Sequence, residues 1–123
     1  MAPVDENADV YTCSTVLTGH TRSISSLKWS YDGSLLASSS ADGCIKVWHN
    51  NTNTCTMSDL HDSGVNDIAW SNTAQYIASA SDDKNIGIWN VETAQPVRLM
   101  KGHTHNVMCV AFNASSTLLV SGM

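Results

Sequence analysis

The sequence predicts an all-β protein that forms part of a β-propeller, and two observations lead to that prediction. The first is an internal repeat, in which His20, His61 and His103 lie 41 and then 42 residues apart. The second is that each repeat divides into short runs rich in β-branched and aromatic residues, which turn residues separate. Four short strands about every 40 residues are typical of propeller blades.

The residues after each histidine keep a common spacing. Apolar residues stand four, seven and nine positions after it in all three repeats, and a serine stands 18 positions after it. The first two repeats continue to an aspartate at 22 positions and a tryptophan at 28 positions. The apolar positions are Ile24, Val65 and Val107, then Leu27, Ile68 and Val110, then Trp29, Trp70 and Phe112.

The turn signals between the runs set the expected strands. We expect them over 24–29, 35–39, 44–48, 54–60, 65–70, 76–80, 85–89, 96–100, 107–112 and 118–121. One more run, over residues 10–17, predicts an orphan outer strand without a neighbour. The expected division is a disordered tail over 1–9 and a partial propeller over 10–123, made of that strand, two full four-stranded blades over 18–60 and 61–100, and half a third blade over 101–123.

Two short signatures resemble the WD40 (WD-repeat) family. The glycine–histidine pairs at residues 19–20 and 102–103 match the start of a WD repeat, and residues 45–48 and 86–89 match its closing strand. The sequence departs from the family where His49 and Asn90 replace the usual aspartate, and where Leu60 replaces the glycine. The resemblance covers about residues 10–123 and implies a non-catalytic scaffold for protein–protein interaction.

The polar residues of each repeat match the hydrogen-bonded tetrad of that family. A Ser–His–Asp set also suggests the triad of a hydrolase, which is the alternative reading. A catalytic set is needed once, however, whereas this set recurs, so we expect a structural role and no enzyme activity. The expected tetrads are His20, Ser38, Asp42 and Trp48, then His61, Ser79, Asp83 and Trp89, with an incomplete tetrad of His103 and Ser121.

The stretches over 37–42, 77–84 and 118–122 closely resemble one WD-repeat subgroup, the seven-bladed subunit of histone H3 lysine-4 methyltransferase complexes, and residues 65–70 also fit its second blade. The resemblance implies an adaptor that binds the histone H3 tail and methyltransferase-complex subunits at the top face of the propeller. It places on that face Ser25, Ala41, Asn66, Asp82 and Met108. Two of these depart from the subgroup, since Asn66 replaces a serine and Met108 replaces one of two rings that clamp a guanidinium.

Other WD-repeat roles stay open. They are a truncated isoform with little independent binding, a ubiquitin-ligase receptor, and a scaffold in transport or ribosome assembly. Ubiquitin-ligase receptors often carry Trp-Asp-x-Arg, and residues 48–51 and 89–92 lack the arginine. The third repeat ends in mid-blade, so we favour truncation of a longer protein. An open arc also exposes blade faces and strand edges, which favours self-association and leaves a ring of several chains as an alternative.

Composition narrows the partners and the location. The formal net charge is −5, from 11 acidic and six basic residues, and the basic residues are scattered, so we expect no direct nucleic-acid binding. No apolar run approaches the roughly 20 residues of a membrane span, and the acidic start is unlike a targeting signal. We therefore expect a nuclear or cytoplasmic location. Phosphate-loop glycines and a metal-ligand set are both missing, so we expect no cofactor and no metal.

Overall fold

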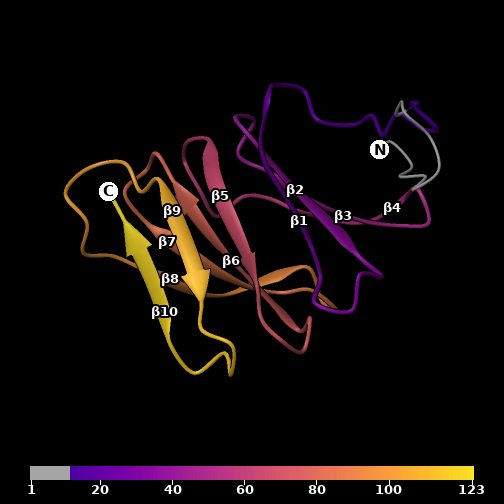
Figure 1. Cartoon of the computed structure of the whole chain (residues 1–123). Coiled ribbons are helices and arrows are strands. Elements are labelled where there is room, and N and C mark those ends of the chain that lie inside the picture. The colour runs from indigo at the N-terminus through magenta and orange to yellow at the C-terminus, as the bar shows by residue number, and fades with distance from the viewer. Residues whose placement is uncertain (1–11) are drawn as a thin grey trace.

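The computed structural model describes residues 12–123, and the tail expected over residues 1–9 lies outside them (Figure 1). Within the described residues there are ten strands, which form two four-stranded sheets and one two-stranded sheet. Every pairing between neighbouring strands is antiparallel. Residues 12–123 contain no helix long and apolar enough to cross a membrane. The predicted all-β, partial propeller is confirmed.

Each sheet is a meander of consecutive strands. The first contains β1 (Ile24–Trp29), β2 (Leu36–Ser40), β3 (Ile45–His49) and β4 (Thr52–Met57). The second contains β5 (Val65–Trp70), β6 (Tyr76–Ser81), β7 (Ile86–Asn90) and β8 (Gln95–Met100). The third contains β9 (Cys109–Phe112) and β10 (Leu119–Gly122). We call these sheets the first, second and third blade.

The strands over 24–29 and 65–70 have the expected bounds, and the bounds of the other eight differ by one to three residues. Two of these differences have a local explanation. The strand expected over 54–60 ends at Met57, because Asp59 adopts a left-handed backbone conformation with φ of 69°. The strand expected from residue 107 begins at Cys109. Val107 instead donates its backbone N–H to Ser81 O of the second blade, at 3.0 Å.

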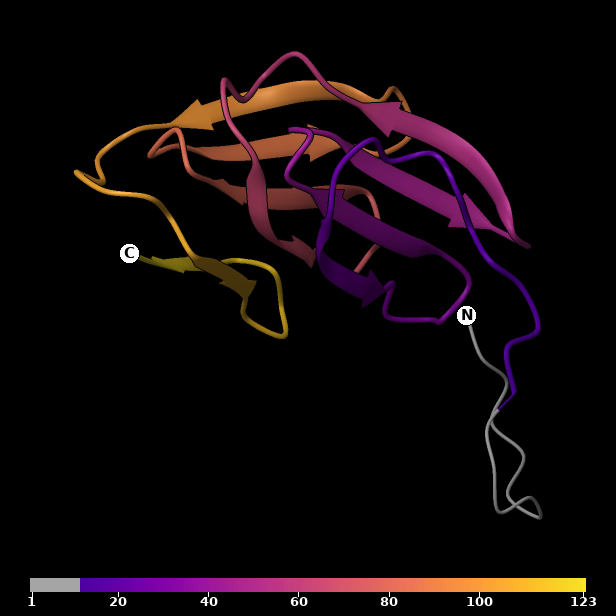
Figure 2. The same ribbon diagram turned by 90° about the horizontal axis from the view of Figure 1, so that it is seen from above.

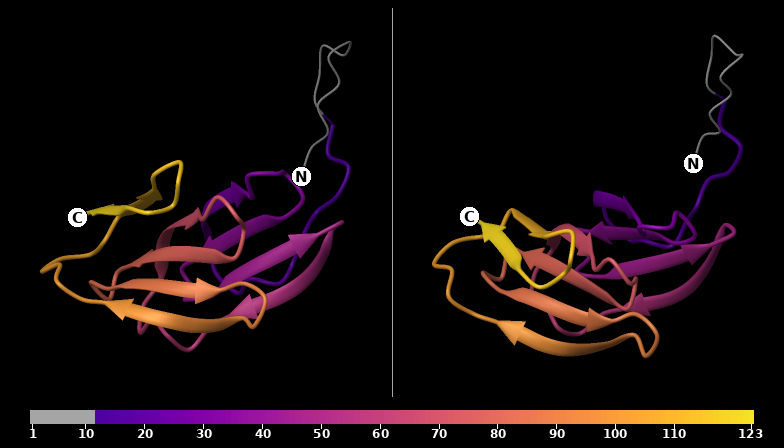
Figure 3. Two further views of the ribbon diagram at one scale, coloured as in Figure 1. Left: turned by 90° about the horizontal axis from the view of Figure 1, so that it is seen from below. Right: turned by 60° about the horizontal axis from the view of Figure 1, so that its bottom comes forward.

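Neighbouring blades contact each other mainly through their first strands. Strand β5 packs against β1 and β2 on one side and against β9 on the other. Figure 2 shows β1 and β5 on the same side of the molecule and β4 and β8 on the opposite side. Figure 3 shows the β9–β10 hairpin beside the second blade. The inner strands are therefore β1, β5 and β9, as in an arc of a propeller.

The apolar core lies between adjacent blades. Val65 and Ile68, four and seven positions after His61, are buried against the first blade. Their counterparts in the first repeat, Ile24 and Leu27, are 47% and 58% exposed, because no described sheet covers that face of the first blade. The buried residues between the first two blades are Ala37, Ile45, Val47, Met57, Val65, Ile68, Ile77 and Trp89. Those between the second and third are Ala78, Ala80, Ile86, Val107 and Val110.

The prediction of an orphan outer strand over residues 10–17 is wrong for the residues that the structure describes. Residues 12–17 form no strand, and residues 10 and 11 lie outside the described residues. An isolated strand leaves its backbone groups without partners, and no described strand pairs with this segment. Val16 and Leu17 instead line a hollow of about 370 Å³ on the open face of the first blade, together with Leu27 and Trp29.

Candidate peptide-binding site between the first two blades

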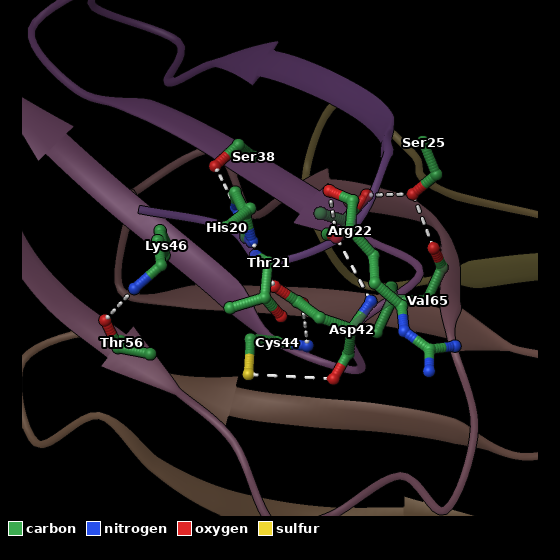
Figure 4. Close-up of polar contacts among 12 residues, drawn as sticks. His20, Thr21, Arg22, Ser25, Ser38, Asp42, Cys44, Lys46, Thr56 and Val65 are labelled. Atoms are coloured by element: carbon green, nitrogen blue, oxygen red, sulfur yellow. Dashed lines mark hydrogen bonds and ion pairs between the residues drawn. The ribbon is translucent and has the colours of Figure 1, made fainter. Parts of the chain in front are cut away.

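The first tetrad is a continuous chain of hydrogen bonds, and Figure 4 shows His20, Ser38 and Asp42 of it. His20 Nδ1 lies 2.9 Å from Asp42 Oδ2, and His20 Nε2 lies 2.7 Å from Ser38 Oγ. A carboxylate only accepts, so we assign the proton to Nδ1 and let Ser38 donate to Nε2. Trp48 Nε1 completes the chain by donating to Ser38 Oγ at 3.0 Å. The network therefore runs from tryptophan to serine to histidine to aspartate.

The second tetrad repeats this geometry at greater depth. His61 Nδ1 lies 2.9 Å from Asp83 Oδ2, and Nε2 lies 2.6 Å from Ser79 Oγ. Trp89 Nε1 donates to Ser79 Oγ at 2.9 Å. Ser79 and Trp89 are fully buried, and so is the His61 side chain. The Ser79 hydroxyl is therefore enclosed within the blade, which favours a structural role for this network.

The third repeat holds only part of this network. His103 Nε2 lies 2.7 Å from Ser121 Oγ, and no described aspartate or tryptophan extends the pair. The structure thus offers one serine–histidine pair beside two complete tetrads within the same chain.

The tetrad aspartates also hold the turn between β2 and β3 and its counterpart in the second blade. Burial raises the pKa of Asp42, but hydrogen bonds from Cys44 N, His20 and Thr21 N outweigh it, so the pKa lies below its ordinary value. The same competition lowers the pKa of Asp83. Both carboxylates are therefore charged at neutral pH, which suits their role as acceptors.

Three residues of the expected peptide-binding face come together on the second and third blades. Asn66 Nδ2 donates to Asp82 Oδ1 at 2.7 Å and to Val107 O at 2.9 Å. The same nitrogen lies 3.8 Å from Met108 Sδ. On the first blade, the Ser25 hydroxyl donates to Val65 O and contacts Ser39 Oγ (Figure 4).

Four of the five expected residues line one polar hollow between the first two blades, with a volume of about 690 Å³. They are Ser25, Ala41, Asn66 and Asp82, and Met108 stands outside the lining, beside Asn66. We call this feature the acidic hollow. Its charged residues outside the tetrads are Arg22, Asp62 and Asp82, and none of them forms an ion pair with another described residue. Two carboxylates against one guanidinium leave the hollow negatively charged.

Asp67 is a junction residue that the sequence did not single out. Its Oδ1 accepts hydrogen bonds from Ser26 Oγ at 3.0 Å and from Ile68 N at 2.9 Å. Its Oδ2 accepts one from Val110 N at 3.2 Å. One carboxylate on β5 thus joins all three blades near their inner strands. The available signal was a charge six positions after His61, where the other repeats have Ser26 and Cys109.

Among residues 12–123 no group of three or more His, Cys, Asp or Glu side chains is arranged to hold a metal ion. The four cysteines, Cys13, Cys44, Cys55 and Cys109, are free thiols. Burial raises the pKa of the Cys55 thiol, which keeps that sulfur protonated at neutral pH.

Comparison with known proteins places the chain in a family. The family model described as "WD domain, G-beta repeat" matches residues 11–49, 53–90 and 94–123. Protein Mut11 of Chlamydomonas reinhardtii is 47% identical over 38 residues, which are 31% of this chain and 10% of that protein. The solved structures of U3-55K and of the RRP9 WD40 repeats each match 87% of this chain with a TM-score of 0.82 and 29% identity. The chain covers 35% and 34% of those two chains. With three repeats matched over most of its length, this chain belongs to the WD40 repeat family.

Proposed function

We propose that this chain is a non-catalytic adaptor that binds a basic peptide segment of a partner protein in the acidic hollow. Membership of the WD40 family supports the general role of a protein-interaction scaffold. The observation that favours this particular surface is the pair of carboxylates, Asp62 and Asp82, which face a polar hollow without an ion-pair partner among the described residues.

The hollow suits a basic side chain for electrostatic reasons. A cation that reaches Asp82 forms a charge-assisted hydrogen bond, which is roughly twice as strong as a neutral one. Ala41 presents only a methyl group at the position where the second blade has Asp82, which leaves space on the first blade's side of the hollow. The polar lining supplies partners for the amide groups of an extended peptide.

The partner class that we propose is a histone-type tail or a basic segment of a methyltransferase-complex subunit, with a nuclear location. This choice rests on the sequence resemblance over residues 37–42 and 77–84. Met108, at 55% exposure, offers a thioether to pack against the aliphatic stem of a basic side chain. It supplies no ring face for a cation–π contact, so the carboxylates must provide most of the affinity.

The test is an NMR titration of the 123-residue chain with a synthetic histone H3 tail peptide, against a peptide whose Lys and Arg are replaced by Gln. Asp82→Asn keeps the shape of the side chain and removes its charge. We expect it to weaken binding by about fivefold or more at low salt, with a smaller loss at high salt. Glu92→Gln is the matched control, because Glu92 is exposed on the β7–β8 turn, outside the hollow. Equal affinity of the two variants, or equal binding of the uncharged peptide, would overturn the proposal.

A further inference from the structure

The fifth position after each histidine makes the same hydrogen bond in the first two blades. Ser25 donates its hydroxyl to Val65 O, and Asn66 donates its amide to Val107 O at 2.9 Å. Val65 and Val107 both stand four positions after a histidine, so the two bonds are equivalent. Either side chain therefore joins its own blade to the next one.

The two positions differ in a second contact. Asn66 Nδ2 also donates to Asp82 Oδ1 at 2.7 Å, whereas the residue that corresponds to Asp82 in the first blade is Ala41. The longer amide thus stands in the blade that carries the acid, and the shorter hydroxyl stands in the blade that lacks it. The amide group of Asn66 has two hydrogens, and the bonds to Asp82 and Val107 use both. The amide of Asn66 is therefore a built-in partner of the Asp82 carboxylate.

We infer that Asn66 makes the Asp82 subsite selective for a lysine ammonium over an arginine guanidinium. This inference rests on the proposed function, since it concerns the same basic peptide. A guanidinium binds a carboxylate best through two parallel hydrogen bonds, one to each oxygen. Asp82 Oδ1 already accepts a hydrogen bond from an amide that Val107 O holds in place, so a guanidinium would have to share that oxygen with Asn66, whereas Oδ2 accepts no hydrogen bond from any described residue. An ammonium is a compact point charge and needs only the free oxygen.

The neighbouring side chain supports the same preference. Met108 Sδ lies 3.8 Å from Asn66 Nδ2, so a thioether occupies the adjacent position on this face. A planar guanidinium gains by stacking on an aromatic face, and a thioether gives it no such surface. The flexible stem of lysine packs on methionine as well as that of arginine does, so Met108 removes an advantage of arginine only.

The experiment compares two capped pentapeptides, Ac-Ala-Ala-Lys-Ala-Ala-amide and its arginine counterpart, titrated into the isotope-labelled 123-residue chain. We expect the lysine peptide to bind about threefold more tightly or better. Asn66→Ser copies the residue of the first blade, which keeps the hydrogen bond to the next blade and is too short to reach Asp82. It should remove the lysine preference or reverse it. Asn66→Thr is a second variant with good strand propensity, in case the first folds poorly.

Asn53→Ser is the matched control, because Asn53 is exposed on β4 and its Nδ2 bonds only Thr56 Oγ1, at 3.1 Å. This control should keep the lysine preference of the original chain. The inference is overturned if Asn66→Ser and Asn66→Thr leave the lysine-to-arginine affinity ratio unchanged, or if the original chain prefers arginine. Either result leaves the proposed function standing. If neither peptide binds, or Asp82→Asn binds both equally well, the proposed function fails and the inference fails with it.

Discussion

Removing the hydroxyl of Ser79 tests whether the tetrads hold the blades together. Ser79 Oγ accepts from Trp89 Nε1 at 2.9 Å and donates to His61 Nε2, 2.6 Å away. All three side chains are fully buried, so Ser79→Ala leaves a donor and an acceptor without partners and out of reach of water. Each orphaned group costs roughly 1–3 kcal/mol. We expect Ser79→Ala to lower the free energy of unfolding by about 3 kcal/mol.

Ser121→Ala is the matched comparison within the same chain. Ser121 Oγ bonds only His103, at 2.7 Å, and Ser121 is half-buried, so water can replace the lost partner. The loss should be about 1 kcal/mol, the net value of one hydrogen bond. Ser38→Ala should resemble Ser79→Ala, because Ser38 bonds both His20 and Trp48.

The assay is urea unfolding followed by tryptophan fluorescence, with equal slopes required across the three variants before the free energies are compared. Ser79→Ala and Ser121→Ala with equal losses would refute the argument that network completeness determines the cost. A hydrolase reading makes the opposite prediction for Ser79→Ala, namely loss of ester hydrolysis without a large loss of stability.

Two further outcomes follow from the carboxylates. Asp67→Ala removes the acceptor of Val110 N and of two other donors, so we expect it to lower the free energy of unfolding by about 2–4 kcal/mol in the same urea assay. Asp62→Ala is the control, and because Asp62 is exposed the loss should be less than about 0.5 kcal/mol. Stability should fall on acidification, because Asp42 and Asp83 have a lowered pKa in the folded chain. Their contribution is fully present above the unfolded pKa of about 3.9 and is lost as the pH falls through the folded values. Melting temperatures from pH 7 down to pH 2 measure this loss, and the double variant Asp42→Asn and Asp83→Asn should flatten the curve.

The blade structure could be predicted from the sequence because every repeat must solve the same packing problem. A buried position such as Ile68 faces the preceding blade, and the spacing of 22 residues between His61 and Asp83 returns the chain to the same hydrogen-bonded network. Strand alternation, turn residues and repeat spacing all agree there, which makes the elements predictable. The strands over 24–29 and 65–70 have the expected bounds.

The contacts between blades could not be predicted in the same way. Residues 12–17 have strand-like composition, yet a strand forms only where a neighbour offers its backbone, and composition does not report the neighbour. Asp67 finds Ser26 and Val110 at separations of 41 and 43 residues, on two different blades. The hydrogen bond of Asn66 to Asp82 likewise depends on the strand register of the second blade, and the family pattern does not contain it.

Differences between the repeats are more informative about function than their common residues. His20 and His61, or Ser38 and Ser79, are explained by one network that each blade needs for its own stability. The backbone carbonyls that Ser25 and Asn66 meet are equivalent, so packing gives no reason for one to be longer than the other. The difference acquires a physical reason only at the surface, where Asn66 meets an acid that the first blade lacks. Ser25 and Asn66 thus share one backbone role and differ in their exposed neighbour, and this difference is the observation on which the proposed selectivity of the acidic hollow rests.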